Sequence, residues 1–170
     1  SLLHGPPGTG KTSTLVAAVK DLVAAGDKVL AAGPSNMAVD VLVERFHQTG
    51  LNVVRVGHPM RVQPAVLETS LDARVQNLPE HARVVKTRRD AAQHQRDADR
   101  YVRNFDAAQR EARRQARAEA RALRKEAEEL EAYLAEKVLR EADVVCATLV
   151  GCDDRRLRGV KFDVVVVDEA

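Results

Sequence analysis

The chain has 170 residues, of which 45% are hydrophobic, 31% are charged and 3% are aromatic, and its formal net charge is +2 at pH 7. This composition supplies enough apolar residues for a core and excludes a wholly disordered chain, and the length suits one domain. The sequence has no apolar run near the roughly 18 to 20 residues of a membrane span, and residues 1–20 lack the pattern of a secretory leader. We therefore expect an intracellular protein, cytoplasmic or nuclear, that does not enter a membrane.

Apolar runs and helical periodicities alternate along both ends of the chain. Helical spacing of apolar residues predicts one helix over 11–25, ending at Gly26, and a second over 37–49, capped by Ser35 or Asn36 and ending at Gly50. Runs bounded by Gly, Pro or Asp predict strands buried on both faces, over residues 2–4, 29–32, 53–56, 144–147 and 162–167. This order predicts an α/β fold, a parallel sheet flanked by helices, with Cys146 as a small core residue.

A long helical insertion separates the third and fourth predicted strands. From Glu80 to Val150 there is neither Gly nor Pro, so the expected division is 1–79, a helical stalk over 80–142, and a return to the sheet domain over 143–170. Residues 82–125 carry 14 basic and 6 acidic groups, a net of +8, whereas 126–142 carry 2 and 6, a net of −4. An apolar stripe spaced by three or four predicts a coiled-coil-like packing seam, formed by Ala112, Ala116, Ala120, Leu123, Ala127, Leu130, Leu134 and Val138.

A second stripe on the insertion is basic. It either follows the phosphate backbone of a nucleic acid or forms a solvated face partly paired with the acidic stretch 126–131. Base stacking is not expected, because no aromatic residues interleave with the basic ones. The stripe consists of Arg110, Arg113, Arg114, Arg117, Arg121 and Arg124.

Residues 5–12 read Gly-Pro-Pro-Gly-Thr-Gly-Lys-Thr and fit the phosphate-loop pattern G-x-x-x-x-G-K-[ST] between a predicted strand and a predicted helix. Inward N–H groups of such a loop and the positive end of the following helix hold phosphates. Lys11 is expected to reach the β and γ phosphates, and the Thr12 hydroxyl to bind Mg²⁺. The predicted nucleotide contacts are Gly5, Pro6, Pro7, Gly8, Thr9, Gly10, Lys11, Thr12 and Ser13.

The partner of this loop is predicted at the other end of the chain. The apolar run 162–167 delivers Asp168 and Glu169 to the carboxyl end of a parallel strand, which faces the same crevice as the phosphate loop. Asp168 is expected to orient Mg²⁺ and its waters, and Glu169 to act as general base for an attacking water. The sequence lacks the Asn-Lys-x-Asp motif of guanine-specific enzymes, so ATP is the expected nucleotide.

Two other kinds of protein also fit a phosphate loop that a helical insertion separates from its acidic partner. A chromosome-maintenance-type ATPase also places coiled coil between its nucleotide motifs, but its Leu-Ser-Gly-Gly-like signature has no counterpart between Leu139 and Asp168. The second alternative is a non-catalytic interaction module whose nucleotide site has lost its function. The intact Lys11 and Thr12 argue against such a loss.

Five motifs together resemble the superfamily 1B helicases, in the group that contains the Upf-type RNA-surveillance helicase, the immunoglobulin-mu-binding-protein helicase and senataxin. The resemblance covers the chain outside the helical insertion, and it departs from the family pattern where Gly33 replaces Ala. The matching segments are His4–Thr12, Gly33–Asp40, Arg55–Pro59, Cys146–Thr148 and Phe162–Ala170.

The resemblance implies a RecA-like ATPase domain in which Lys11 and Glu169 are catalytic and ATP-Mg²⁺ drives movement along single-stranded DNA or RNA, 5′-to-3′. It also implies that Pro34, Ser35, Asn36 and Thr148 contact the strand. For His58 we expect a structural role in the turn. Because relatives need a second RecA-like domain that supplies arginine fingers, the 170 residues are expected to be an excerpt of a longer helicase and inactive alone. No obligate oligomer is implied.

Overall fold

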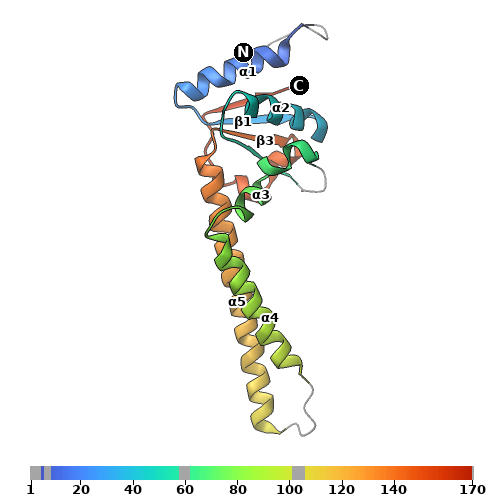
Figure 1. The fold of residues 1–170 in the computed structure, drawn as a ribbon, viewed down its shortest axis with the longest axis vertical. Coiled ribbons are helices and arrows are strands. Elements are labelled where there is room, and N and C mark those ends of the chain that lie inside the picture. The colour runs from blue at the N-terminus through green and yellow to red at the C-terminus, as the bar shows by residue number, and fades with distance from the viewer. Residues whose placement is uncertain (1–4, 6–8, 58–61, 101–105, 170) are drawn as a thin grey trace. The chain divides into compact units, whose positions relative to one another are not determined.

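The structure, a computed structural model, describes residues 5, 9–57, 62–100 and 106–169. The described chain forms two compact units, one made of residues 1–76 and 135–170 and the other of residues 77–134. The ribbon in Figure 1 shows the elements of both units. No helix in the described part of the chain is long and apolar enough to cross a membrane.

The first unit is built on a parallel sheet of four strands in the order β2-β3-β1-β4 (Figure 1). The strands are β1 (Val29–Gly33), β2 (Val53–Arg55), β3 (Val144–Thr148) and β4 (Val164–Val167). β1 and β3 are the inner strands and are buried almost throughout, as their continuous apolar runs predict. The expected α/β class is confirmed. The predicted strand over residues 2–4 lies outside the described residues.

Two helices pack on this sheet. α1 (Lys11–Ala24) and α2 (Asn36–Gln48) begin and end within one or two residues of the predicted bounds. Their apolar faces share one core cluster with the strands, in which Val19, Leu42 and Phe46 are fully buried. Ser35 is the N-cap of α2, because its side chain accepts a hydrogen bond from the N–H of Ala38 at 3.1 Å.

Short helices occupy segments for which the sequence predicted no element. A 3₁₀ helix, η2 (Pro64–Thr69), and α3 (Leu71–Gln76) follow β2. Two further 3₁₀ turns, η3 (Val150–Asp153) and η4 (Arg155–Leu157), lie between β3 and β4. Such short pieces carry too few residues to show a helical period in the sequence.

The second unit is a helical hairpin of α4 (His81–Asp99) and the first part of α5 (Ala107–Glu141), side by side in Figure 1. A side-chain contact between His94 and Glu119 and an ion pair between Asp99 and Arg117 connect the two helices in antiparallel register. In the seam, Ala91 and Ala98 of α4 are buried, as are Ala120, Ala127 and Leu134 of α5. The predicted seam is therefore present, except that Ala112 at its start is exposed.

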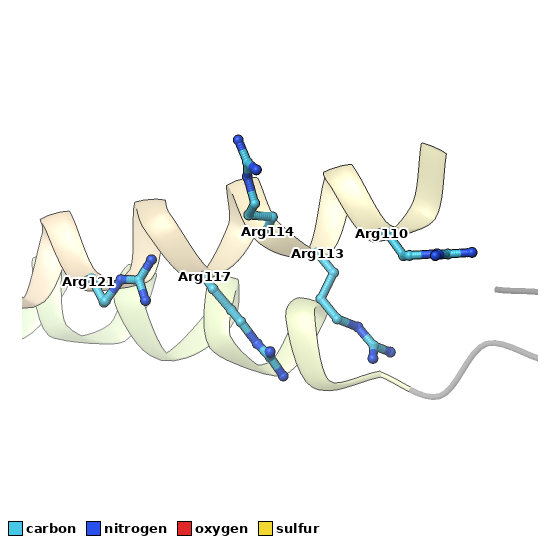
Figure 2. Close-up of a pocket in the computed structure, with 5 residues that line it drawn as sticks. All are labelled: Arg110, Arg113, Arg114, Arg117 and Arg121. Carbon is cyan, nitrogen blue, oxygen red and sulfur yellow. The ribbon is translucent and has the colours of Figure 1, made fainter. Parts of the chain in front are cut away.

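Among the ion pairs of the described residues, none joins the basic stripe to the acidic stretch 126–131, which one of the two sequence interpretations proposed. Glu126 and Glu131 instead form ion pairs with Arg83 and Arg88 of α4. The stripe has other partners: Arg117 pairs with Asp99, and Arg113 donates to the carbonyl of Arg100. Figure 2 shows Arg113 and Arg117 reaching toward α4 and Arg114 pointing away from it. A shallow hollow is lined by Arg110, Arg113, Arg114, Arg117 and Arg121.

The last turns of α5, from residue 135 onward, belong to the compact sheet unit. Leu139 and Ala142 are buried there. Lys28 Nζ donates to the carbonyl of Arg140 at 2.9 Å, and Asn52 Nδ2 donates to that of Glu141 at 2.7 Å. These contacts join the end of α5 to the residues that precede β1 and β2.

Candidate functional site

The carboxyl edge of the sheet gathers residues from three distant parts of the chain. In the strand register Gly33 of β1 lies beside Thr148 of β3, and Ala32 lies beside Val167 of β4. The ladder continues past the strand end, because the N–H of Asp168 donates to the carbonyl of Ala32 at 2.9 Å. Asp168, Thr148 and the segment that follows Gly33 therefore leave the sheet at one edge, where ligands bind in parallel α/β sheets.

The described part of the phosphate loop has the geometry that its glycines predict. Gly10 has φ 83°, a left-handed conformation that favours glycine, and α1 begins at the next residue without a side-chain cap. Lys11 Nζ donates to the carbonyl of Gly5 at 2.6 Å, which holds the ammonium group across the loop. A Cβ at Gly5 would stand 2.7 Å from Thr9 Oγ1, so the loop closes tightly there. Pro6, Pro7 and Gly8 lie outside the described residues.

Figure 1 shows α1 running back across the sheet against the direction of β1, so its first turn lies at the same end of the unit as the carboxyl ends of the strands. That turn contains Thr12, which is half-buried, and Ser13, whose Oγ accepts a hydrogen bond from Arg45 at 3.4 Å. Among the described residues, no hydrogen bond joins Thr12 to Asp168. Thr12 and Asp168 thus lie at the same end of the sheet unit.

Asp168 and Glu169 follow the fourth strand, and their carboxylates are the groups of interest. Within the described part of the chain, neither carboxylate accepts a hydrogen bond or forms an ion pair, and Glu169 is exposed with φ 55°. A left-handed conformation costs a non-glycine residue about 1 to 2 kcal/mol. The described residues contain no group of three His, Cys, Asp or Glu side chains that could hold a metal. One carboxylate and one hydroxyl suit Mg²⁺, which usually keeps waters and binds substrate phosphates.

The segment after β1 presents exposed Pro34 and Ser35 and the half-buried Asn36. Ser35 caps α2, and Asn36 is the first residue of the helix. The N–H groups of a first helical turn lack partners in the helix and point toward the solvent side of its positive end. This arrangement is suited to a phosphate of a nucleic-acid backbone.

Thr148, the fourth predicted strand contact, ends β3 on the same edge. Its Oγ1 accepts a hydrogen bond from the N–H of Gly151 at 2.9 Å, which starts the turn of η3. The hydroxyl can still donate its own proton to a phosphate oxygen. His58, for which the sequence predicts a role in the turn, lies outside the described residues.

Sequence reasoning missed one group of side chains at this site. Arg55 of β2 is buried and contacts two residues of α2, because its Nε donates to Asp40 Oδ1 at 3.0 Å and its Nη2 to Asn36 Oδ1 at 2.9 Å. A signal was present in the sequence: Arg55 interrupts an apolar strand, and Asp40 lies beside Val39 on the apolar side of α2. Two opposite charges in buried positions indicate a pair.

The fold and this sheet edge define a phosphate-loop nucleotide-binding domain. A sequence profile of the family described as an AAA domain matches residues 1–170. The chain therefore belongs to this AAA domain family, among the Upf1-like members of helicase superfamily 1.

Similar proteins carry helicase and nucleic-acid-binding names. The DNA polymerase alpha-associated DNA helicase A of Schizosaccharomyces pombe is 36% identical over 179 residues, which cover 100% of this chain and 25% of the relative. The DNA-binding protein SMUBP-2 of Rattus norvegicus is 40% identical over 174 residues, covering 99% of this chain and 17% of the relative. The ATP-dependent helicase upf1 of S. pombe is 35% identical over 183 residues, covering 100% of this chain and 17% of the relative. The chain thus spans a quarter or less of the length of these curated relatives.

Proposed function

We propose that the protein uses ATP to move along single-stranded DNA or RNA and to unwind duplexes, in the 5′-to-3′ direction. The observation that carries this proposal is the register of the sheet, which brings Asp168, Thr148 and the Pro34–Asn36 segment to one edge. A nucleotide site and a strand-binding site that share three neighbouring strands can influence each other through one hydrogen-bonded ladder. The helicase names of the relatives support the same activity.

Each residue has a chemical task in this proposal. Lys11 neutralises charge on the β and γ phosphates, and the loop N–H groups hold the phosphates in place. Thr12 and Asp168 would hold Mg²⁺, which neutralises the phosphate charge when bound. Glu169 accepts a proton from the attacking water, a contribution of about 10² to 10⁴ in rate. A second RecA-like domain would add an arginine, worth about 10³ to 10⁵.

On the strand side, the contacts are to the backbone of the nucleic acid. Thr148 and the first turn of α2 offer hydroxyl and N–H donors, which suit phosphate oxygens and carry no sequence information. We therefore expect binding that is insensitive to base sequence.

The test is Lys11→Ala in the full-length protein, assayed on DNA and RNA duplexes with either a 5′ or a 3′ single-stranded tail. We expect loss of ATP hydrolysis and of unwinding, because the charge on the γ phosphate loses its cation. Lys20→Ala is the matched control, since Lys20 is an exposed lysine of the same helix. ATP-driven unwinding retained by Lys11→Ala would contradict the assignment. If the wild type unwound only the duplexes with a 3′ tail, the proposed direction would be wrong.

A further inference from the structure

Arg55 is an unusually buried arginine. Its side chain is 1% exposed, and that of its partner Asp40 is 2% exposed. Removing two charges from water costs several kcal/mol for each ion, and replacing such a pair with apolar residues is often neutral or stabilising. The need for stability alone therefore does not explain why an arginine occupies this position in a short apolar strand.

Each guanidinium nitrogen of Arg55 and each carboxylate oxygen of Asp40 makes at least one hydrogen bond. The three guanidinium nitrogens of Arg55 donate to Asp40 Oδ1, to Asn36 Oδ1 and to the carbonyl of Val56. The other carboxylate oxygen of Asp40 accepts a hydrogen bond from the N–H of Gln63 at 3.0 Å. The guanidinium plane is thus fixed in one orientation by Asp40 and Asn36 of α2 and by the carbonyl of Val56, which follows β2. Asp40 is itself held by the N–H of Gln63, before η2.

Gly57 makes room for this arrangement. A Cβ at that position would stand 2.7 Å from Arg55 Nη1, closer than real Cβ contacts. The spacing of Arg55 and Gly57 in the sequence therefore has a physical reason: the glycine lets the chain pass over the guanidinium group.

The fixed guanidinium sets the orientation of the Asn36 amide. Arginine can only donate hydrogen bonds, so the amide oxygen of Asn36 must face Arg55 and its NH₂ group must face the other way. Within the described part of the chain, this NH₂ group donates to no protein acceptor. It extends from the first residue of α2, beside the exposed Ser35, and offers two N–H donors in the same region as the N–H groups of the first helical turn.

We propose that Arg55, held by Asp40, is a positioning residue that turns the Asn36 amide so that its NH₂ group donates to a phosphate of the bound single strand. This inference rests on the proposed function and adds to it a group that never touches the nucleic acid. Preorganisation of this kind lowers the cost of binding, because the amide does not have to be ordered when the strand arrives.

The experiment is a double-mutant cycle in the full-length protein. Binding of a short fluorescein-labelled thymidine oligonucleotide is measured by anisotropy at fixed ionic strength without nucleotide, for the wild type, Asn36→Ala, Arg55→Lys and the double variant. Lysine keeps the charge but presents one nitrogen, which cannot contact Asp40, Asn36 and Val56 together. We expect each single variant to weaken binding by about tenfold, the worth of one hydrogen bond to a charged group.

The expected signature is non-additivity. The double variant should bind no more weakly than Asn36→Ala alone, because Arg55 acts only through Asn36. Arg74→Lys is the matched control, since Arg74 is a half-buried arginine that donates to the carbonyl of Val53 in β2, and it should bind like the wild type.

A second variant keeps the proposal testable if Arg55→Lys does not fold. Asn36→Asp retains an oxygen for Arg55 but turns a second oxygen outward, where it repels phosphate. We expect the thermal midpoint to be unchanged or raised and binding to fall by more than it does in Asn36→Ala. If the amide served only to satisfy Arg55, Asn36→Asp would bind like the wild type, and the proposal would be overturned.

The remaining outcomes separate this inference from the proposed function. If Asn36→Ala weakens binding but Arg55→Lys does not, or if the two losses multiply, the positioning role is wrong and the strand contact stands. If Asn36→Ala binds like the wild type, the strand contact at Asn36 is wrong and the positioning role is wrong with it. The nucleotide site is tested separately by Lys11→Ala.

Discussion

Arginine serves opposite purposes in the two units of this protein. In the sheet unit, Arg55 is buried, and each of its nitrogens has a partner inside the unit. In the hairpin, Arg83 and Arg88 pair with glutamates at the surface, where both members of each pair are exposed. Exposed ion pairs contribute little to the stability of the folded state and are screened by salt. A buried charge that loses its partner, in contrast, strongly destabilises the folded state. An excess of basic residues in the hairpin is therefore weaker evidence for a function than the burial of Arg55.

The largest expected effect comes from removing the partner of the buried arginine. Asp40→Ala leaves the Arg55 charge uncompensated in the core, and we expect a loss of about 3 to 5 kcal/mol in the free energy of local unfolding. Hydrogen exchange of the α2 and β2 amides in the full-length protein measures this loss. Asp21→Ala, at an exposed position on α1, is the control and should change exchange little. Equal exchange in the two variants would show that the pair is energetically unimportant.

The next prediction uses the thiol that lies beside Arg55 in the strand register. Burial raises the pKa of Cys146 from 9.0 to about 12. Because the folded pKa is the higher one, the protonated thiol contributes stability that is present below pH 9 and is lost as the pH rises toward about 12. Cys146→Ala should therefore make unfolding of the sheet unit less sensitive to alkaline pH. The same pH dependence with and without the thiol would contradict this explanation.

The smallest effect is expected in the hairpin. Arg88→Ala removes an exposed ion pair with Glu131, and we expect a change of less than about 1 kcal/mol in the opening of α4, which disappears at high salt. Arg89→Ala is the matched control, because this exposed neighbour forms no ion pair within the described residues. The loss in the free energy of local unfolding that Asp40→Ala causes should persist at high salt. A loss in Arg88→Ala as large as that in Asp40→Ala would remove the distinction between the two units.

Much of the sheet unit was predictable because local signals agree with one another there. The apolar runs of β1 and β3 are bounded by polar or turn residues, Ser35 has the chemistry of an N-cap, and Asp168 follows the apolar run that ends in β4. The parallel arrangement then places the ends of these runs together without further information.

Other features depend on tertiary placement and could not be predicted from local patterns. The contact between Arg55 and Asn36 joins residues 19 positions apart, and it requires β2 to lie at the sheet edge beside β3, an order that the apolar runs do not specify. The helical insertion lacks Gly and Pro, so no breaker marked the end of α4 at Asp99. A capping signal was present at Asp106, whose Oδ1 accepts a hydrogen bond from the N–H of Gln109 at 2.8 Å.

The most direct test of the account is the rate of ATP hydrolysis by the full-length protein with and without a saturating single-stranded oligonucleotide. A nucleotide site and a strand site that share the edge formed by β1, β3 and β4 should be coupled, so we predict that the strand accelerates hydrolysis. Asn36→Ala should require more oligonucleotide for half of the maximal acceleration. Hydrolysis at the same rate with and without the strand would contradict the claim that one sheet edge carries both sites.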